Sequence, residues 1–242
     1  MRAVAEGASA DRKAELARRL ATVRARIDAA CGAAGRASDE VTLIAVTKTY
    51  PVSDIRLLCE LGVCDIGENR DQEAAPKAAE CASLGVPVTW HFVGQLQTNK
   101  VASVVSYASF IHSVDRLRLA GSLGARASRA GREVTCLVQV SLDGDPERGG
   151  AFGPDVAAVA DAIAAQDSLV LGGVMAVAPL EMDAGVAFRQ LAEIAGRVRS
   201  AHPEAVIISA GMSADLEQAI GAGATHVRVG TALLGGRSAF VR

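Results

Sequence analysis

Aromatic residues are scarce in this chain, at 3% of 242 residues, and neither sign of charge dominates, because the formal net charge is −2. Proteins that bind nucleic acid need clustered positive charge, and those that hold single strands also use aromatic rings that stack on bases. We therefore expect no nucleic-acid partner. The small net charge also gives no reason to expect attraction to an anionic membrane surface.

Apolar runs of membrane-spanning length are also missing. The N-terminus reads M-R-A-V-A-E-G-A-S-A-D-R and lacks the apolar h-region of a signal peptide. The five cysteines are an odd number, form no C-x-x-C pair and have no zinc-site spacing with histidine. We expect a soluble, cytoplasmic protein with reduced thiols and no metal site.

Lysine is rare as well: only four of the 25 basic residues are lysines. One of them, Lys48, ends the apolar, β-branched run V-T-L-I-A-V-T-K, which Pro51 closes. Such a run is typical of a strand buried on both faces in a parallel sheet. Partial burial penalises the charged ammonium, lowers its pKa and frees a lone pair for attack on a carbonyl. The alternative is a strand-end lysine whose amine extends to water.

From there the chain alternates short apolar segments with amphipathic ones. The predicted strands are residues 41–48, 63–67, 88–94, 110–114, 133–141, 169–177, 205–210 and 226–230. Helical segments are predicted between them, at residues 52–61, 71–84, 98–107, 115–130, 154–165, 184–201 and 215–222. Repeated β-then-α units predict a parallel sheet with right-handed crossovers, and eight of them favour a single-domain (β/α)8 TIM barrel. An open doubly wound sheet is the alternative, although no G-x-G-x-x-G follows the first strand.

An additional helix is predicted before the barrel, because Leu16, Leu20, Val23 and Ile27 recur at helical spacing. Residues 1–9 are predicted to be a flexible terminus, and residues 10–242 to form one domain.

The loops after the last two strands carry the best candidates for anion binding. The first contains G-M-S-A-D, in which Gly211 permits a tight turn and Ser213 is an N-cap candidate for a helix beginning near Asp215. In the second, Gly230 and Thr231 open a short terminal helix. Phosphate usually binds at these two loops of a TIM barrel, and two helix N-termini with hydroxyls suit a phosphate dianion. The alternative is that both are ordinary structural caps.

Strand alternation places Arg228 on the face opposite Val227 and Val229, and so inside the predicted barrel. A buried arginine needs an acceptor. That acceptor is either a bound ligand or a carboxylate such as Glu68.

Together, a reactive lysine, a phosphate cradle and an inward arginine suggest pyridoxal 5′-phosphate (PLP). Lys48 would form a Schiff base, and Arg228 would contact the ring nitrogen. Since a guanidinium only donates hydrogen bonds, it would hold that nitrogen unprotonated and make the cofactor a poor electron sink.

Five motifs resemble the pyridoxal phosphate homeostasis protein family, and the resemblance extends over about residues 41–235. They are L-I-A-V-T-K-T-Y-P, D-I-G-E-N-R-D-Q-E, W-H-F-V-G-Q-L-Q-T-N-K, S-A-G-M-S-A-D-L-E-Q-A-I and H-V-R-V-G-T-A-L-L-G. The resemblance implies a barrel of the alanine racemase N-terminal type and a Schiff base on Lys48. It also implies cofactor contacts from Asn69, Met212, Ser213, Arg228, Gly230 and Thr231.

Two positions depart from the family pattern: Arg70 replaces the usual aromatic residue after G-E-N, and Arg148 stands where lysine is common. Both concern the rim of the pocket rather than the Schiff base. His91 matches the family, but a histidine on an apolar strand is more often a hydrogen-bonded core residue than a participant in chemistry.

Three functions remain open. The first, also implied by the resemblance, is a PLP-binding protein that buffers or delivers the cofactor in vitamin B6 and amino-acid homeostasis. It would have no established turnover, would act as a monomer and could serve apo forms of PLP-dependent enzymes. The second is a weak racemase or lyase, although only Tyr50 and Tyr107 are available as tyrosine bases. The third is a Schiff-base aldolase whose substrate carries the phosphate.

Overall fold

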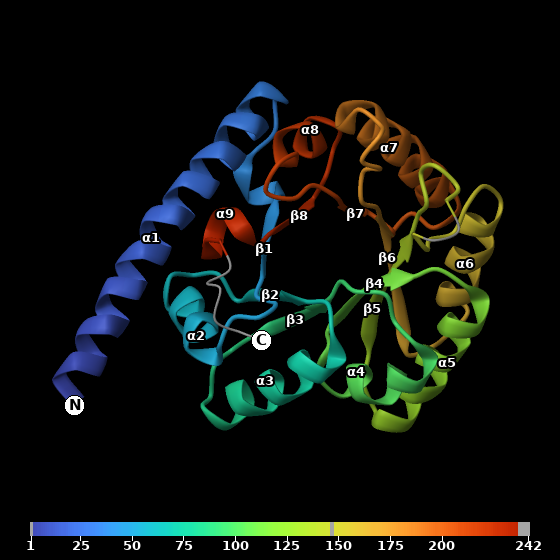
Figure 1. Cartoon of the computed structure of the whole chain (residues 1–242). Coiled ribbons are helices and arrows are strands. Elements are labelled where there is room, and N and C mark those ends of the chain that lie inside the picture. The colour runs from blue at the N-terminus through green and yellow to red at the C-terminus, as the bar shows by residue number, and fades with distance from the viewer. Residues whose placement is uncertain (1, 146–147, 237–242) are drawn as a thin grey trace.

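Eight parallel strands close into a barrel in chain order, with β8 hydrogen-bonded to β1 (Figure 1). The computed structural model describes residues 2–145 and 148–236, with side chains from residue 9 onward. The strands are β1 (Thr42–Val46), β2 (Asp65–Glu68), β3 (Thr89–Phe92), β4 (Phe110–Val114), β5 (Val134–Gln139), β6 (Leu169–Met175), β7 (Ile207–Ser209) and β8 (His226–Val229). The predicted (β/α)8 barrel is therefore confirmed, and the open sheet is wrong.

Helices follow the strands and form the outer layer of the barrel (Figure 1). They are α2 (Val52–Glu60), α3 (Asp71–Ser83), α4 (Val101–Tyr107), α5 (Leu117–Ala130), α6 (Asp155–Ala164), α7 (Ala184–Ala201), α8 (Leu216–Gly221) and α9 (Thr231–Leu234). Two 3₁₀ turns complete the order, η1 (Ser38–Glu40) and η2 (Thr98–Lys100). The single helix predicted over residues 98–107 is thus divided between η2 and α4. No helix in the described part of the chain is long and apolar enough to cross a membrane.

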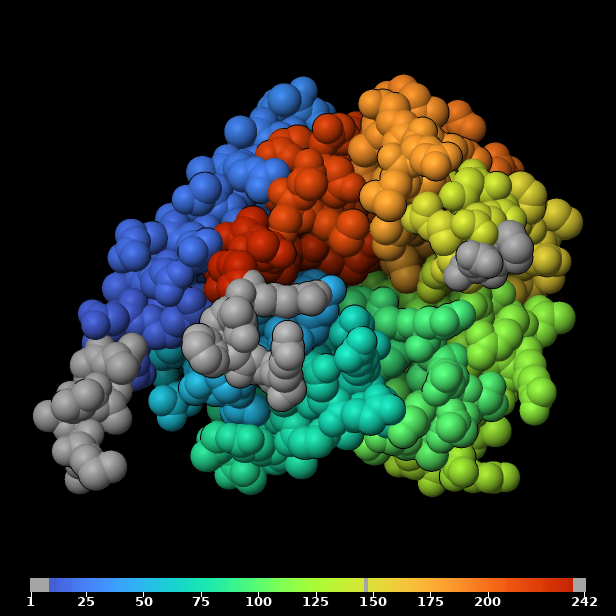
Figure 2. Space-filling model, viewed as in Figure 1, coloured from blue at the N-terminus to red at the C-terminus, as the bar shows by residue number. Residues whose placement is uncertain are grey.

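The additional N-terminal helix, α1 (Arg2–Ala33), packs against α8, α9 and α2. Figure 2 shows it along one edge of the molecule, beside α8 and α9. Its buried side chains include the four that the helical spacing predicted, Leu16, Leu20, Val23 and Ile27, and also Ala30 and Cys31. The helix begins at Arg2, earlier than the pattern indicated. The flexibility of residues 1–9 stays a prediction.

The first strand is shorter than predicted, since β1 ends at Val46 rather than Lys48. The chain turns immediately afterwards: the Tyr50 amide donates to the Thr47 carbonyl at 3.0 Å, and Thr49 has a left-handed φ of 69°. Lys48 therefore lies on a turn at the carboxyl end of the strand, where barrel enzymes place reactive groups.

The two faces of the strands have opposite environments, as alternation predicted. Ala45, Val227 and Val229 face outward and belong to an apolar cluster with the buried face of α1. Ile44 lies in register with Arg228, and both face the barrel interior. The outer layer supplies most of the apolar burial, which leaves the interior free to hold polar groups.

Shortening the buried Leu16 to alanine should lower the free energy of unfolding by about 2 to 5 kcal/mol, because the lost methyl groups leave a cavity between α1 and the barrel. Leu16 is fully buried, whereas Leu180 is fully exposed. The control, Leu180→Ala, should therefore change stability by less than about 0.5 kcal/mol. Urea titration measures both. Equal effects would mean that α1 is not part of the cooperative fold.

Candidate functional site at the mouth of the barrel

Lys48 is distinguished from the other lysines by having no partner. Its half-buried side chain makes no hydrogen bond or ion pair with residues 2–145 or 148–236. The others are paired: the Nζ atom of Lys13 lies 2.7 Å from Glu60, that of Lys77 lies 2.7 Å from Glu68, and that of Lys100 lies 3.8 Å from Asp71. Only the Lys48 amine is thus free of a carboxylate and available for a carbonyl.

The last loop of the barrel lies directly beside the Lys48 turn. Because β8 pairs with β1, Gly230 packs on Val46, and a Cβ atom at Gly230 would lie 3.3 Å from the Val46 carbonyl oxygen. Thr231 follows Gly230 directly, and Lys48 lies two residues after Val46. Consecutive Cα atoms are about 3.8 Å apart, so the lysine and the N-terminus of α9 share one small region.

Ser213 joins the loop after β7 to the same region. Its Oγ accepts a hydrogen bond from the Ala232 amide at 3.2 Å, in the first turn of α9. The expectation that Ser213 caps the helix after β7 is therefore wrong. Asp215 is the N-cap of α8, and its carboxylate accepts from the Met212 amide at 2.6 Å. The hydroxyl instead accepts from the first turn of α9, and Gly211, with a φ of 88°, turns the chain two residues before Ser213.

Arg26 supports this loop from outside, and the sequence analysis did not identify it. Its guanidinium donates to the Ser213 carbonyl at 3.0 Å and forms a two-pronged ion pair with Glu217, at 2.6 and 2.8 Å. This contact lowers the pKa of Glu217 and raises that of Arg26. The helix α1 therefore anchors the loop that carries Ser213.

Arg228 points into the barrel and is 5% exposed. It donates to the Ser209 hydroxyl at 2.6 Å and to the Ala176 carbonyl at 2.9 Å. The alternative ion pair with Glu68 is wrong, because Glu68 faces outward and binds Thr47 and Lys77, each at 2.7 Å. Within the described chain, no carboxylate lies at ion-pair distance from Arg228.

Burial lowers the pKa of Arg228 to about 10, and the negative charge of Asp215 opposes that change. The group is therefore still a cation at neutral pH. Two of its N–H groups have protein acceptors, and the others have none among the residues that the structure describes. The remaining N–H groups of this buried cation can donate to a bound molecule.

Asn69 follows β2, and its Oδ1 atom is buried without a hydrogen-bond partner in the described structure. Such an orphaned acceptor fits a polar group of a bound molecule. Gly94 packs so closely on the Asn69 backbone that a Cβ atom there would lie 2.0 Å from its carbonyl oxygen. Met212, by contrast, is 38% exposed at the edge of the site.

The two departures from the family pattern lie at the rim. Arg70 is largely exposed and lies 3.9 Å from Glu73. Arg148 pairs with Asp143 at 3.2 Å and donates to the Ala178 carbonyl at 3.3 Å. Arg70 also lines a cavity of about 480 Å³, together with Asn69 and Lys100.

The barrel interior contains a group of rings that the sequence analysis did not assemble. His91 has a partner on each ring nitrogen, Asp65 and His112, each at 3.0 Å. Phe110 stacks on His91, with ring centroids 4.5 Å apart. His91 is thus a hydrogen-bonded core histidine, as the more common interpretation had it. The inward positions of His112 and Ser209 on their predicted strands were the available signal for this group.

Burial lowers the pKa of two histidines in the barrel interior, His112 and His226. His112 is fully buried, and its pKa lies well below the ordinary value, with the charges of His91 and Arg228 adding to the effect. The pKa of His226 falls to about 4 through burial and the proximity of His91, while Asp65 opposes the change. At neutral pH both rings are therefore uncharged.

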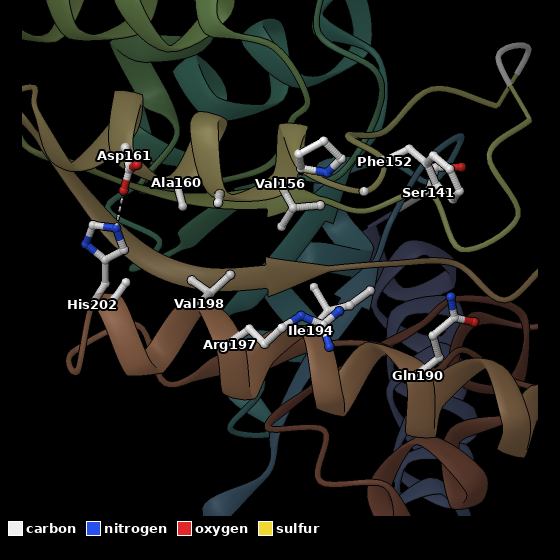
Figure 3. Close-up of a pocket in the computed structure, with 14 residues that line it drawn as sticks. Ser141, Phe152, Val156, Ala160, Asp161, Gln190, Ile194, Arg197, Val198 and His202 are labelled. Carbon is white, nitrogen blue, oxygen red and sulfur yellow. Dashed lines mark hydrogen bonds and ion pairs between the residues drawn. The ribbon is translucent and has the colours of Figure 1, made fainter.

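A groove between α6 and α7 is a separate feature on the outer surface (Figure 3). Its cavity of about 430 Å³ is lined by apolar side chains such as Val156, Ile194 and Val198, and His202 closes one end by a 2.8 Å contact with Asp161. None of the predicted site residues lines it. The described residues also contain no group of three or more His, Cys, Asp or Glu side chains that could hold a metal ion.

The fold and the site define a class that comparison with known proteins identifies. The family model described as the alanine racemase N-terminal domain matches residues 19–238, so the chain belongs to that family. An alanine racemase from Clostridium difficile has the same fold, with a TM-score of 0.70 at 14% identity, over 93% of this chain and 58% of that one.

Within this class, the chain belongs to the pyridoxal phosphate homeostasis proteins. It is 46% identical to the protein of that name from Mycobacterium leprae, over 93% of this chain and 94% of its relative. It is 36% identical to the one from Escherichia coli K12, over 92% and 97%. The solved structure of PipY from Synechococcus elongatus with PLP bound has a TM-score of 0.79 at 34% identity, covering 91% of this chain and all of that one.

Replacing His226 with asparagine should flatten the acid side of the stability profile. The folded pKa of about 4 lies below the ordinary 6.5. The unfolded state therefore binds the extra proton first, and stability falls with decreasing pH by up to about 1.4 kcal/mol per unit. Between pH 6.5 and about 4 the native protein should lose stability faster than His226→Asn in urea titrations. Parallel profiles would contradict this assignment.

Proposed function

We propose that the chain binds PLP at the barrel mouth and acts in its homeostasis as a buffer or carrier. The observation that carries this proposal is the Lys48 amine, which has no partner among the described residues and lies beside the Gly230–Thr231 turn, just after the strand that pairs with the strand of Arg228. The relatives named above support it, and so does the PLP-bound PipY structure. The expected site residues follow four neighbouring strands. Met212 and Ser213 follow β7, Gly230 and Thr231 follow β8, Lys48 follows β1, and Asn69 follows β2.

Each group of PLP finds a chemically matched partner. Lys48 would supply the amine for the aldehyde group. The Ser213 hydroxyl and the backbone N–H groups at Gly230 and Thr231 would hold the phosphate. Asn69 and Met212 would line the ring, and Arg228 would donate to its nitrogen.

Bound PLP supplies an electron sink whose strength depends on protonation of its ring nitrogen. Arg228 has protons to donate and accepts none, so it keeps that nitrogen unprotonated. Transaminases place a carboxylate at this position. A guanidinium there favours holding the cofactor over activating it, which suits a carrier.

The tyrosines also support a carrier over a racemase. Racemisation needs a base on each face of the substrate carbon. The Tyr50 hydroxyl is engaged, donating to the Gly235 carbonyl at 2.9 Å. Burial raises the pKa of Tyr107 above its ordinary value, so the phenol keeps its proton at neutral pH and cannot accept one from a substrate.

The cellular setting is part of the same proposal. Cys31, Cys81 and Cys136 are buried free thiols, which suits a reducing cytoplasm. We place the protein there as a monomer that passes PLP to apo-enzymes.

Borohydride reduction of the PLP-loaded chain, followed by peptide mapping, tests the attachment site. One pyridoxylated peptide, carrying Lys48, is expected, because the other amines are held by carboxylates. Lys48→Ala should abolish the label and the yellow colour. The matched control Lys100→Ala removes a rim lysine and should keep both. Labelling of Lys100 in the native chain would overturn the assignment.

Incubation with amino acids in deuterated water separates carrier from enzyme. The loaded protein should leave the α-proton unexchanged over the time in which it restores activity to an apo form of a PLP enzyme. Free PLP at the same concentration is the control for transfer. Deuterium incorporation that is lost in Lys48→Ala would instead establish a weak racemase or lyase.

A further inference from the structure

Five polar side chains form one continuous row of hydrogen bonds inside the barrel. Arg228 donates to the Ser209 Oγ at 2.6 Å, and that oxygen lies 2.9 Å from the Nδ1 of His112. The Nε2 of His112 lies 3.0 Å from the Nδ1 of His91, and the Nε2 of His91 lies 3.0 Å from the Oδ1 of Asp65. The row joins β8, β7, β4, β3 and β2 across the interior.

The carboxylate end fixes the direction of the first bond, and one proton per ring then fixes the direction of the others. A guanidinium only donates, and an ionised carboxylate only accepts. At one end, His91 must therefore carry a proton on Nε2, toward Asp65. With one proton per ring, its Nδ1 accepts from the Nε2–H of His112. The Nδ1 of His112 then accepts from the Ser209 hydroxyl, whose oxygen accepts from Arg228. The guanidinium end is compatible with this arrangement, because the Ser209 oxygen can accept from Arg228 while its own proton is donated to His112.

The middle of the row has no alternative contacts to water. Ser209 and His112 are fully buried and His91 is nearly so, whereas the Asp65 side chain is 36% exposed at the opposite end of the barrel from the mouth. An unmade bond in this region leaves a buried polar atom without a partner, which is costly. The row therefore holds its members in one arrangement.

We propose that Ser209 and His112 are positioning residues for Arg228, and that the directed row Arg228→Ser209→His112→His91→Asp65 holds the guanidinium toward the barrel mouth. This role rests on the proposed function, since the group so aimed is the partner of the PLP ring nitrogen. An arginine side chain has many rotamers, and fixing it in advance lowers the entropy lost when the ligand binds.

The hydrogen-bond direction is tested on the full chain without added cofactor. Long-range ¹H–¹⁵N spectra of histidine-labelled protein at neutral pH should show His91 and His112 each with a single proton, on Nε2. Assignment uses the variants His91→Gln and His112→Gln. A proton on Nδ1 of either ring, or a second proton on His91, would reverse the bond to His112 and overturn the row.

The positioning role is tested with Ser209→Ala, which removes the link between Arg228 and His112. Ser113→Ala is the matched control, because Ser113 is an equally buried strand serine whose Oγ has no partner in the described structure. PLP should bind about tenfold more weakly to Ser209→Ala and normally to Ser113→Ala. Addition of PLP should shift the His112 Nδ1 resonance in the native chain and the control, but not in Ser209→Ala.

The possible results distinguish failure of the positioning role from failure of the proposed function. Equal affinity and an equal Nδ1 shift in the two serine variants would overturn the positioning role while leaving PLP binding intact. A native chain that binds no PLP would overturn the proposed function, and the positioning role with it. The spectra of the cofactor-free protein still decide the direction of the row, whichever result the cofactor gives.

Discussion

Pairing of β8 with β1 is the constraint on which the rest of the structure depends. It closes the barrel, and it also places the Gly230–Thr231 turn, which follows β8, beside the Lys48 turn, which follows β1. Lys48 and Thr231 are far apart in sequence, and neither helix packing nor local turn chemistry would bring them together. The mouth of the barrel exists as a site only because the sheet has no open edge.

The outer face of the barrel, which packs on the helices, and its interior face differ in polarity. Most outward-facing residues of the strands are apolar and pack against the helices, with Glu68 as a polar exception. The interior instead contains a cation, imidazole rings and a serine hydroxyl, all hydrogen-bonded to one another. Stability therefore comes mainly from the outer layer. The interior is free to orient the group that faces the ligand, at the cost of requiring every buried polar atom to be matched.

Much of this could be predicted from the sequence, because it is encoded by local periodicity. The eight strands, the additional helix and the inward direction of Arg228 all follow from apolar spacing. The cap role of Ser213 could not, since its partner Ala232 lies in α9, after the next strand, and is reached only when the barrel folds. The ion pair between Arg26 and Glu217 and the contact between His91 and His112 could not be predicted either, because each joins segments that are distant in sequence. Hydrogen bonds between distant segments leave no periodic trace in the sequence.

The contact between Arg26 and the Ser213 loop gives α1 a part in the ligand-binding unit, although this helix precedes the whole barrel. A fragment beginning at β1 would retain all eight strands and all the predicted site residues. It would nevertheless lose the contact by which Arg26 holds the Ser213 loop from outside. The minimal functional unit of this fold is therefore larger than its set of eight β/α repeats.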